Sequence, residues 1–148
     1  MKTQTISQLT GLVLWMILLS ACGGGGGVEV TAVTSFERPD PPVEYSEKSN
    51  PLVGDSGAVD AGRVLYRSYC ATCHGESGMG DGPSAGGLNP RPQPLAVNQE
   101  GLNDAYLYWR IAEGGLRPPF ASAMPSWKTI LTDEEIWQVV SYLRTISH

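Results

Sequence analysis

The hydrophobic positions near the C-terminus repeat with the period of a helix. Four apolar side chains follow the i, i+3, i+4, i+7 spacing of one helical face: Ile136, Val139, Val140 and Leu143. A capping box precedes them, Thr132-Asp133-Glu134-Glu135, in which the first and last side chains satisfy free backbone N–H groups. The pattern predicts an amphipathic helix that begins at this box. Trp137 falls outside the stripe, so we expect it at the edge of the domain.

Two further helices are predicted upstream from their end signals. The first runs from about Ala58 to Cys70, with Ser56 or Asp55 as its cap. The second runs from about Asp104 to Glu113, is capped by Asn103 and is stopped by Gly114-Gly115. Its apolar side chains are expected in the core: Tyr106, Leu107, Trp109 and Ile111. No stretch has the length and alternation of a convincing strand, so the fold class is all-α.

An apolar run of a different kind occupies the N-terminus. Lys2 is followed by the unbroken run Leu12 to Leu19, which is too short for the roughly 20 residues of a membrane-spanning helix. It has the length of a secretory signal. Its end, Leu19-Ser20-Ala21-Cys22, resembles the bacterial lipoprotein signal, which implies cleavage of residues 1–21 and acylation of Cys22. The alternative is a plain secretory peptide with a chance cysteine.

Residues 22–57 have the composition of a linker. Gly23 to Gly27 is a run of five glycines, and prolines, acidic residues and serines follow without a helical or strand period. The segment holds six acidic and two basic residues, a net charge of −4. Such a composition buries too little apolar surface to offset the entropy of ordering. We therefore expect a flexible acidic linker before a domain at 58–148; the alternative is a segment that docks along a partner protein.

The overall composition excludes several classes of function. The 148 residues carry a formal charge of −5, which offers no basic surface for a nucleic-acid backbone. Two histidines and three cysteines are too few for a multi-zinc protein or a disulfide framework.

The chemical centre of the predicted domain is Cys70-Ala71-Thr72-Cys73-His74. Cysteines three residues apart on a helical turn share a face, so both sulfurs can form thioethers to one haem, and the next residue can bind its iron. A zinc knuckle would need a second ligand pair. A thioredoxin-like pair would need a βαβ context, and a structural disulfide would leave His74 without a role. The motif predicts one covalently bound haem c, held by Cys70, Cys73 and His74.

The domain resembles the class I c-type cytochromes at four places. Gly62 and Tyr66 match the small and aromatic residues where the first and last helices cross in that family. The Gly-rich stretch 75–83 follows the haem motif, and the segments Met124-Pro125-Ser126-Trp127 and Leu131 to Ile136 also match. The resemblance implies the cytochrome c fold, three to five helices and loops around one haem. The plan of a lipoprotein with one such domain is also similar to the small cytochrome subunit of alternative complex III.

The second axial ligand decides between electron transfer and catalysis. Met79 lies five residues after His74, in the loop that leaves the proximal side, and we do not expect it to reach the other face of the ring. His148 is the last residue. Met124 stands where the resemblance implies the distal methionine. A thioether at this position raises the reduction potential of the haem iron relative to a second histidine ligand, and it closes the iron to substrates. We therefore predict an electron-transfer protein and not an enzyme.

Residues around the haem are less specified by the sequence. In the family a proline carbonyl accepts the second N–H of the iron-binding histidine, and here Pro90, Pro92 and Pro94 compete for that role. Trp127, Arg91 and Arg117 are candidates for contact with the haem propionates. For both arginines the alternative is a solvated surface charge, and for Trp127 it is packing in the core.

Three functions remain in competition. The first is a membrane-tethered carrier between a quinol-oxidising complex and an oxidase or reductase, exported and anchored by lipid to the outer face of a bacterial cell membrane or to a membrane facing the periplasm. The second is a fixed subunit of a larger respiratory or photosynthetic complex. The third is a haem sensor or enzyme with a labile sixth ligand.

Overall fold

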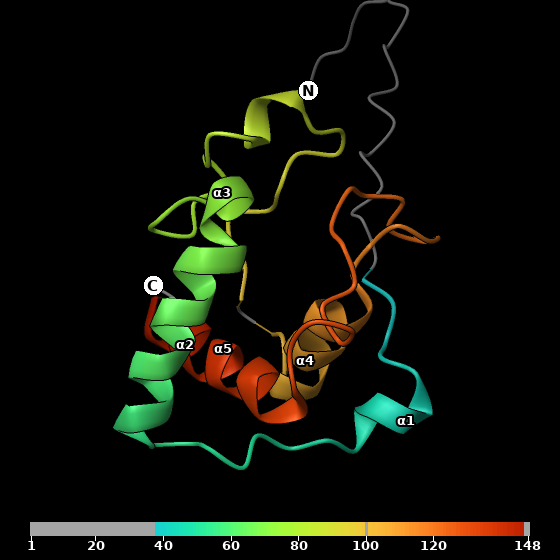
Figure 1. The fold of residues 1–148 in the computed structure, drawn as a ribbon. Helices are drawn as coiled ribbons and strands as arrows, with labels where there is room; N and C mark the ends of the chain where they lie inside the picture. The colour runs from blue at the N-terminus through green and yellow to red at the C-terminus, as the bar shows by residue number, and fades with distance from the viewer. Residues whose placement is uncertain (1–37, 100, 147–148) are drawn as a thin grey trace, which may run out of the picture. The chain divides into compact units, whose positions relative to one another are not determined.

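The computed structural model describes residues 38–99 and 101–146 (Figure 1). Its helices are α1 (Val43–Ser46), α2 (Ser56–Tyr69), α3 (Ala71–His74), the 3-10 turn η1 (Ala85–Gly87), α4 (Asp104–Glu113) and α5 (Asp133–Ile146). Within these described ranges there is no strand, which confirms the all-α class. No described helix is both long and apolar enough to cross a membrane. The predicted signal peptide, Cys22, the glycine run and His148 lie outside the described residues.

The ends of the three long helices follow the predicted caps. The Asp55 carboxylate accepts the N–H groups of Gly57 and Ala58 at 2.8 and 3.1 Å, which places the start of α2 at Ser56. Asn103 caps α4 through the N–H of Tyr106 at 2.8 Å. Thr132 and Glu135 form the reciprocal capping box of α5, with bonds of 2.8 and 3.3 Å. These contacts satisfy N–H groups that the helices themselves leave free.

Helices α2 and α5 cross at Gly62. A Cβ at this position would lie 1.9 Å from the carbonyl oxygen of Gln138, so a larger residue has no room. One turn further along α2, the fully buried Tyr66 packs its ring against Tyr142, with ring centroids 5.3 Å apart. The small and aromatic pair therefore lies at the helix crossing, as the resemblance implied.

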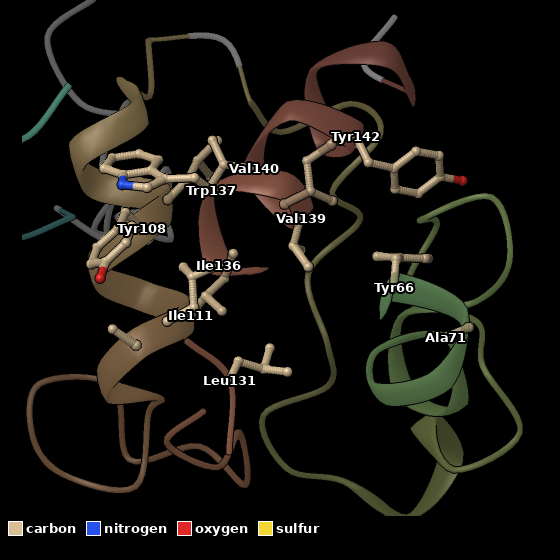
Figure 2. Close-up of a cluster of buried hydrophobic side chains, with 13 residues drawn as sticks. Tyr66, Ala71, Tyr108, Ile111, Leu131, Ile136, Trp137, Val139, Val140 and Tyr142 are labelled. Atoms are coloured by element: carbon tan, nitrogen blue, oxygen red, sulfur yellow. The ribbon is translucent and has the colours of Figure 1, made fainter. Parts of the chain in front are cut away.

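The core lies between α2, α4 and α5 (Figure 2). The four predicted stripe residues of α5 are all buried, and Val140 and Ile136 have no exposed surface. The prediction for Trp137 is wrong: it is 7% exposed, and its ring lies 4.3 Å from that of Tyr108 on α4. Because α5 packs against both α2 and α4, it buries a wider part of its circumference than the single stripe of four residues.

Residues 38–55, which we call the N-terminal strap, differ from the predicted flexible linker. The strap includes α1 and packs two half-buried side chains, Tyr45 and Leu52, against the core. Its Asn50 donates to Ser141 Oγ at 3.0 Å, and the Lys48 ammonium lies 4.9 Å from the centre of the Tyr108 ring. The composition of the strap is polar, but these few long-range contacts are enough to order it, so the folded unit begins before residue 58.

Candidate functional site: a haem-binding motif and a methionine loop

The three residues of the haem motif lie on one short helical turn. Cys70 caps α3, and its carbonyl accepts the N–H groups of Cys73 and His74 at 3.1 and 2.9 Å. Both cysteines are free thiols and half-buried. The motif therefore lies on a single helical turn, which is the local structure that a shared face for these side chains requires.

The segment after His74 fixes the backbone of this turn. Gly75 ends α3 with a φ of 78°, in the left-handed region that glycine enters without steric cost. The His74 carbonyl then accepts the N–H of Gly80 at 2.8 Å, and the buried Tyr66 hydroxyl donates to the Gly75 carbonyl at 2.8 Å. The iron-binding candidate is therefore held from α2 as well as from its own loop.

The His74 side chain is half-buried and has few hydrogen-bond partners. Its Nδ1 is a buried polar atom for which the described residues supply no hydrogen bond of standard geometry. Burial lowers the pKa of His74, which favours the neutral imidazole that binds metals. The backbone of Gln93 acts in the opposite direction on that pKa. The sequence had suggested a proline carbonyl as the hydrogen-bond acceptor for His74. The backbone group that acts on His74 belongs to Gln93, which lies between two of the three candidate prolines, Pro92 and Pro94.

Burial also sets the chemistry of the first cysteine. It raises the pKa of the Cys70 thiol to about 12, with a further contribution from Cys73. Catalytic redox cysteines instead have a lowered pKa, because the thiolate is the nucleophile. Cys70 is therefore a neutral thiol at pH 7, which argues against a thioredoxin-like role.

Met124 lies in a loop attached to the end of α4. Its carbonyl accepts the N–H of Gly115 at 2.8 Å, and the Gly115 carbonyl accepts the N–H of Ser122 at 2.7 Å. After Met124, the N–H groups of Trp127 and Lys128 donate to Ile111 and Ala112 on the last turn of α4, each at 3.2 Å. The half-buried Met124 side chain packs against the core.

The donor set of these residues fits a haem. Two free thiols, a neutral imidazole and a soft thioether match covalent attachment with two axial ligands. In the described part of the chain, no group of three or more His, Cys, Asp or Glu side chains is placed to hold a bare metal ion.

The remaining candidates are placed less decisively. Arg91 and Arg117 are both exposed, in agreement with solvated charges. Trp127 is half-buried, and its ring lies 5.4 Å from that of Tyr69. Met79 is 46% exposed in the loop after the haem motif.

Sequence reasoning missed Arg110. Its guanidinium lies 3.3 Å from the centre of the Phe120 ring and donates to the Gly114 carbonyl, so it holds the loop that leads to Met124. The available signal was its position in the last turn of α4, where basic side chains often bind the final carbonyls.

Comparison with known proteins identifies the family of this chain. The family described as cytochrome c oxidase, cbb3-type, subunit III matches residues 57–143, which is more than half of the chain. The chain belongs to this family of c-type cytochromes. Membership implies haem c as the cofactor of this cytochrome and supports a role in electron transfer.

Curated relatives share the cytochrome domain within longer proteins. The cytochrome c subunit of the quinone alcohol dehydrogenase of Gluconobacter oxydans (strain 621H) is 36% identical over 63% of this cytochrome and 20% of its own length. The subunit CcoP of the cbb3-type cytochrome c oxidase of Azospirillum brasilense is 30% identical, over 70% of this chain and 33% of its own. Cytochrome c550 of Pseudomonas aeruginosa PAO1 is also 30% identical, over 60% of this chain and 56% of its own length. This cytochrome therefore spans well under two thirds of these relatives.

Solved structures support the fold. A chain of the reducing HAO-like protein complex of Kuenenia stuttgartiensis superposes with a TM-score of 0.57 at 24% identity, covering 76% of this cytochrome and 53% of that chain. Cytochrome cL of Methylophaga aminisulfidivorans superposes with a TM-score of 0.51 at 25% identity, covering 66% of this cytochrome and 60% of that chain. Together with the helical architecture, these likenesses confirm the predicted cytochrome c fold.

Proposed function

We propose that this chain carries one electron at a time on a single covalently bound haem c. The observation that supports this most directly is the α3 turn, which carries Cys70, Cys73 and a His74 whose lowered pKa favours the neutral imidazole. Met124 is the proposed second axial ligand, because its loop is fixed to the same domain by backbone bonds on both sides. The proposal includes Cys70 and Cys73 as the sites of thioether attachment.

When bound, haem c supplies an iron that changes between the ferric and ferrous states. Cys70 and Cys73 would hold the macrocycle in place, and His74 would approach the iron as the neutral imidazole that its burial favours. The Met124 thioether is a soft ligand that would close the sixth position. A closed position leaves no site for a substrate at the metal, so we propose an electron carrier and not an enzyme.

The visible spectrum of the purified protein tests this assignment. After denaturation and acid–acetone extraction, haem that stays with the polypeptide shows covalent attachment. A weak long-wavelength methionine–ferric band should be present in the wild type and absent from Met124→Ala, whereas Met79→Ala should retain it. A wild type that lacks the band and binds carbon monoxide when reduced would instead have an open site, and the sensor or enzyme alternative would replace electron transfer.

We also propose that the chain is exported and tethered by lipid on Cys22. The short apolar run ending in Leu19-Ser20-Ala21-Cys22 supports this, and such an anchor would hold the domain outside the cytoplasm on a bacterial membrane. In cells that process lipoproteins, Cys22→Ser should move the cytochrome from the membrane fraction to the soluble fraction. Retention of Cys22→Ser in the membrane after removal of residues 1–21, verified by mass spectrometry, would contradict the lipid anchor.

The proposed partners are redox proteins, with a quinol-oxidising complex as donor and an oxidase or reductase as acceptor. Two relatives are named as subunits of an alcohol dehydrogenase and of a cbb3-type oxidase, which supports the alternative of a fixed subunit. Affinity purification in a mild detergent separates these cases. A stoichiometric complex that survives purification would contradict a free carrier.

A further inference from the structure

The N-terminal strap reaches the last turn of α4 through one side chain. The Tyr45 hydroxyl donates to the Glu113 carboxylate, and its ring lies 6.1 Å from that of Tyr108. The strap lies outside residues 57–143, which the family match covers. The bond from Tyr45 to Glu113 therefore joins the cytochrome domain to a segment that the family match does not include.

The same carboxylate also holds the methionine loop. Lys128 Nζ lies 2.6 Å from Glu113 Oε1, the oxygen that accepts from Tyr45. Lys128 follows Met124 by four residues, and its N–H is bonded to the Ala112 carbonyl on α4. In between, the Ser126 hydroxyl donates to that carbonyl at 2.7 Å. Glu113 thus joins the strap on one side to the loop on the other.

We propose that Tyr45 and Glu113 are positioning residues for Met124, so that the strap keeps the distal ligand on the iron. This inference rests on the proposed function, because it requires Met124 to be an axial ligand. The Lys128 and Glu113 side chains are 49% and 34% exposed, and an ion pair at such exposure stabilises little by itself. The bond from Tyr45 restricts the carboxylate to the rotamer that meets Lys128. Both contacts favour the ionised form and lower the pKa of Glu113.

The second anchor of the strap supplies a matched control. Asn50 Nδ2 donates to Ser141 Oγ on α5 at 3.0 Å, and Asn50 Oδ1 accepts the N–H of Leu52 within the strap. Asn50→Ala therefore weakens the strap without removing the bond to Glu113. Tyr45→Phe does the reverse, since it removes the hydroxyl and keeps the ring beside Tyr108.

Imidazole binding to the ferric, haem-loaded, full-length protein measures how readily Met124 leaves the iron. Because imidazole binds the open form, its apparent affinity rises with the population of that form. We expect Tyr45→Phe to bind imidazole about three- to tenfold more tightly than the wild type, since one bond to a charged group is lost. Asn50→Ala should leave the affinity unchanged. In Lys128→Met, the further change Tyr45→Phe should have less effect than it has alone, because the two side chains share one carboxylate.

A second readout does not involve the iron. Amide hydrogen exchange at Trp127 and Lys128 should be faster in Tyr45→Phe, because these N–H groups hold the loop to α4. If Tyr45→Phe matches the wild type in imidazole affinity and exchange, or if Asn50→Ala raises both equally, the positioning role is overturned while Met124 ligation stands. If the wild type lacks the methionine–ferric band, the proposed ligation fails, and this inference fails with it.

Discussion

Substitution of Gly62 by alanine tests whether the crossing of α2 and α5 holds the domain together. A Cβ here would lie 1.9 Å from the Gln138 carbonyl oxygen, 2.4 Å from its carbon and 3.1 Å from Tyr142 Cβ. Ordinary contacts begin near 3.4 Å, so the helices would have to separate by about 1.5 Å, and a gap of 0.5–1 Å already forfeits a quarter to a half of a dispersion contact. The obstacle is backbone, which cannot rotate away as a flexible side chain would.

Two opposing terms set the magnitude. Overpacking in a core costs about 1–3 kcal/mol and occasionally more, whereas alanine in a helix interior gains about 1 kcal/mol over glycine. Because a backbone carbonyl blocks the new methyl group, the upper part of the overpacking range applies. We therefore expect Gly62→Ala to lower the free energy of unfolding by about 2 kcal/mol.

Urea unfolding of the haem-loaded protein measures this loss, with two spectroscopic probes to check that the transition is two-state. Gly86→Ala is the matched control, since a Cβ there meets nothing within 4 Å, and it should change stability by no more than about 0.5 kcal/mol. A Gly62→Ala protein as stable as the wild type would show that the helices can separate without loss, and the argument from close packing would be refuted.

Three other substitutions test the caps and the methionine loop. Asp55→Ala should lower the free energy of unfolding by about 1 kcal/mol, because it removes the N-cap of α2. The pKa of Glu113 is lowered mainly by Lys128, so the stability that this pair contributes is present above the pKa of the unfolded state and is lost as the pH falls through the pKa of the folded state. Lys128→Met should therefore lower the free energy of unfolding by no more than about 1 kcal/mol at pH 7 and by nothing once the carboxyl is protonated. Urea unfolding at a series of pH values measures this difference. Arg110→Lys keeps the charge but loses the planar stack on Phe120, and a drop of about 1 kcal/mol in the same assay is expected.

The parts of the fold that sequence reasoning predicted are specified locally. The cap of each long helix lies within three residues of the N–H group that it satisfies, as Asp55, Asn103 and Thr132 show. The haem motif is equally local, because five consecutive residues on one turn carry both thiols and the imidazole. Such signals depend on spacing alone and can be read without knowledge of the tertiary structure.

The parts that it missed depend on contacts between distant residues. Tyr45 meets Glu113, 68 positions away, and Asn50 meets Ser141, 91 positions away. No local composition reveals such partners, so the strap was expected to be a flexible linker. Trp137 was misplaced for a related reason, since its burial comes from Tyr108 on α4 and not from the period of its own helix.

The two proposed axial ligands therefore differ in how the chain specifies them. His74 is fixed by its own turn and by the bond from Tyr66 to the next residue, so its position depends on α2 and the loop that follows. Met124 is fixed through the end of α4, where Glu113 also receives the strap. Changes in the strap should therefore alter the distal side of the haem and leave the proximal side unchanged. It follows that whatever binds or displaces the strap has a physical route to Met124, the proposed sixth ligand, and would through that ligand change the reduction potential.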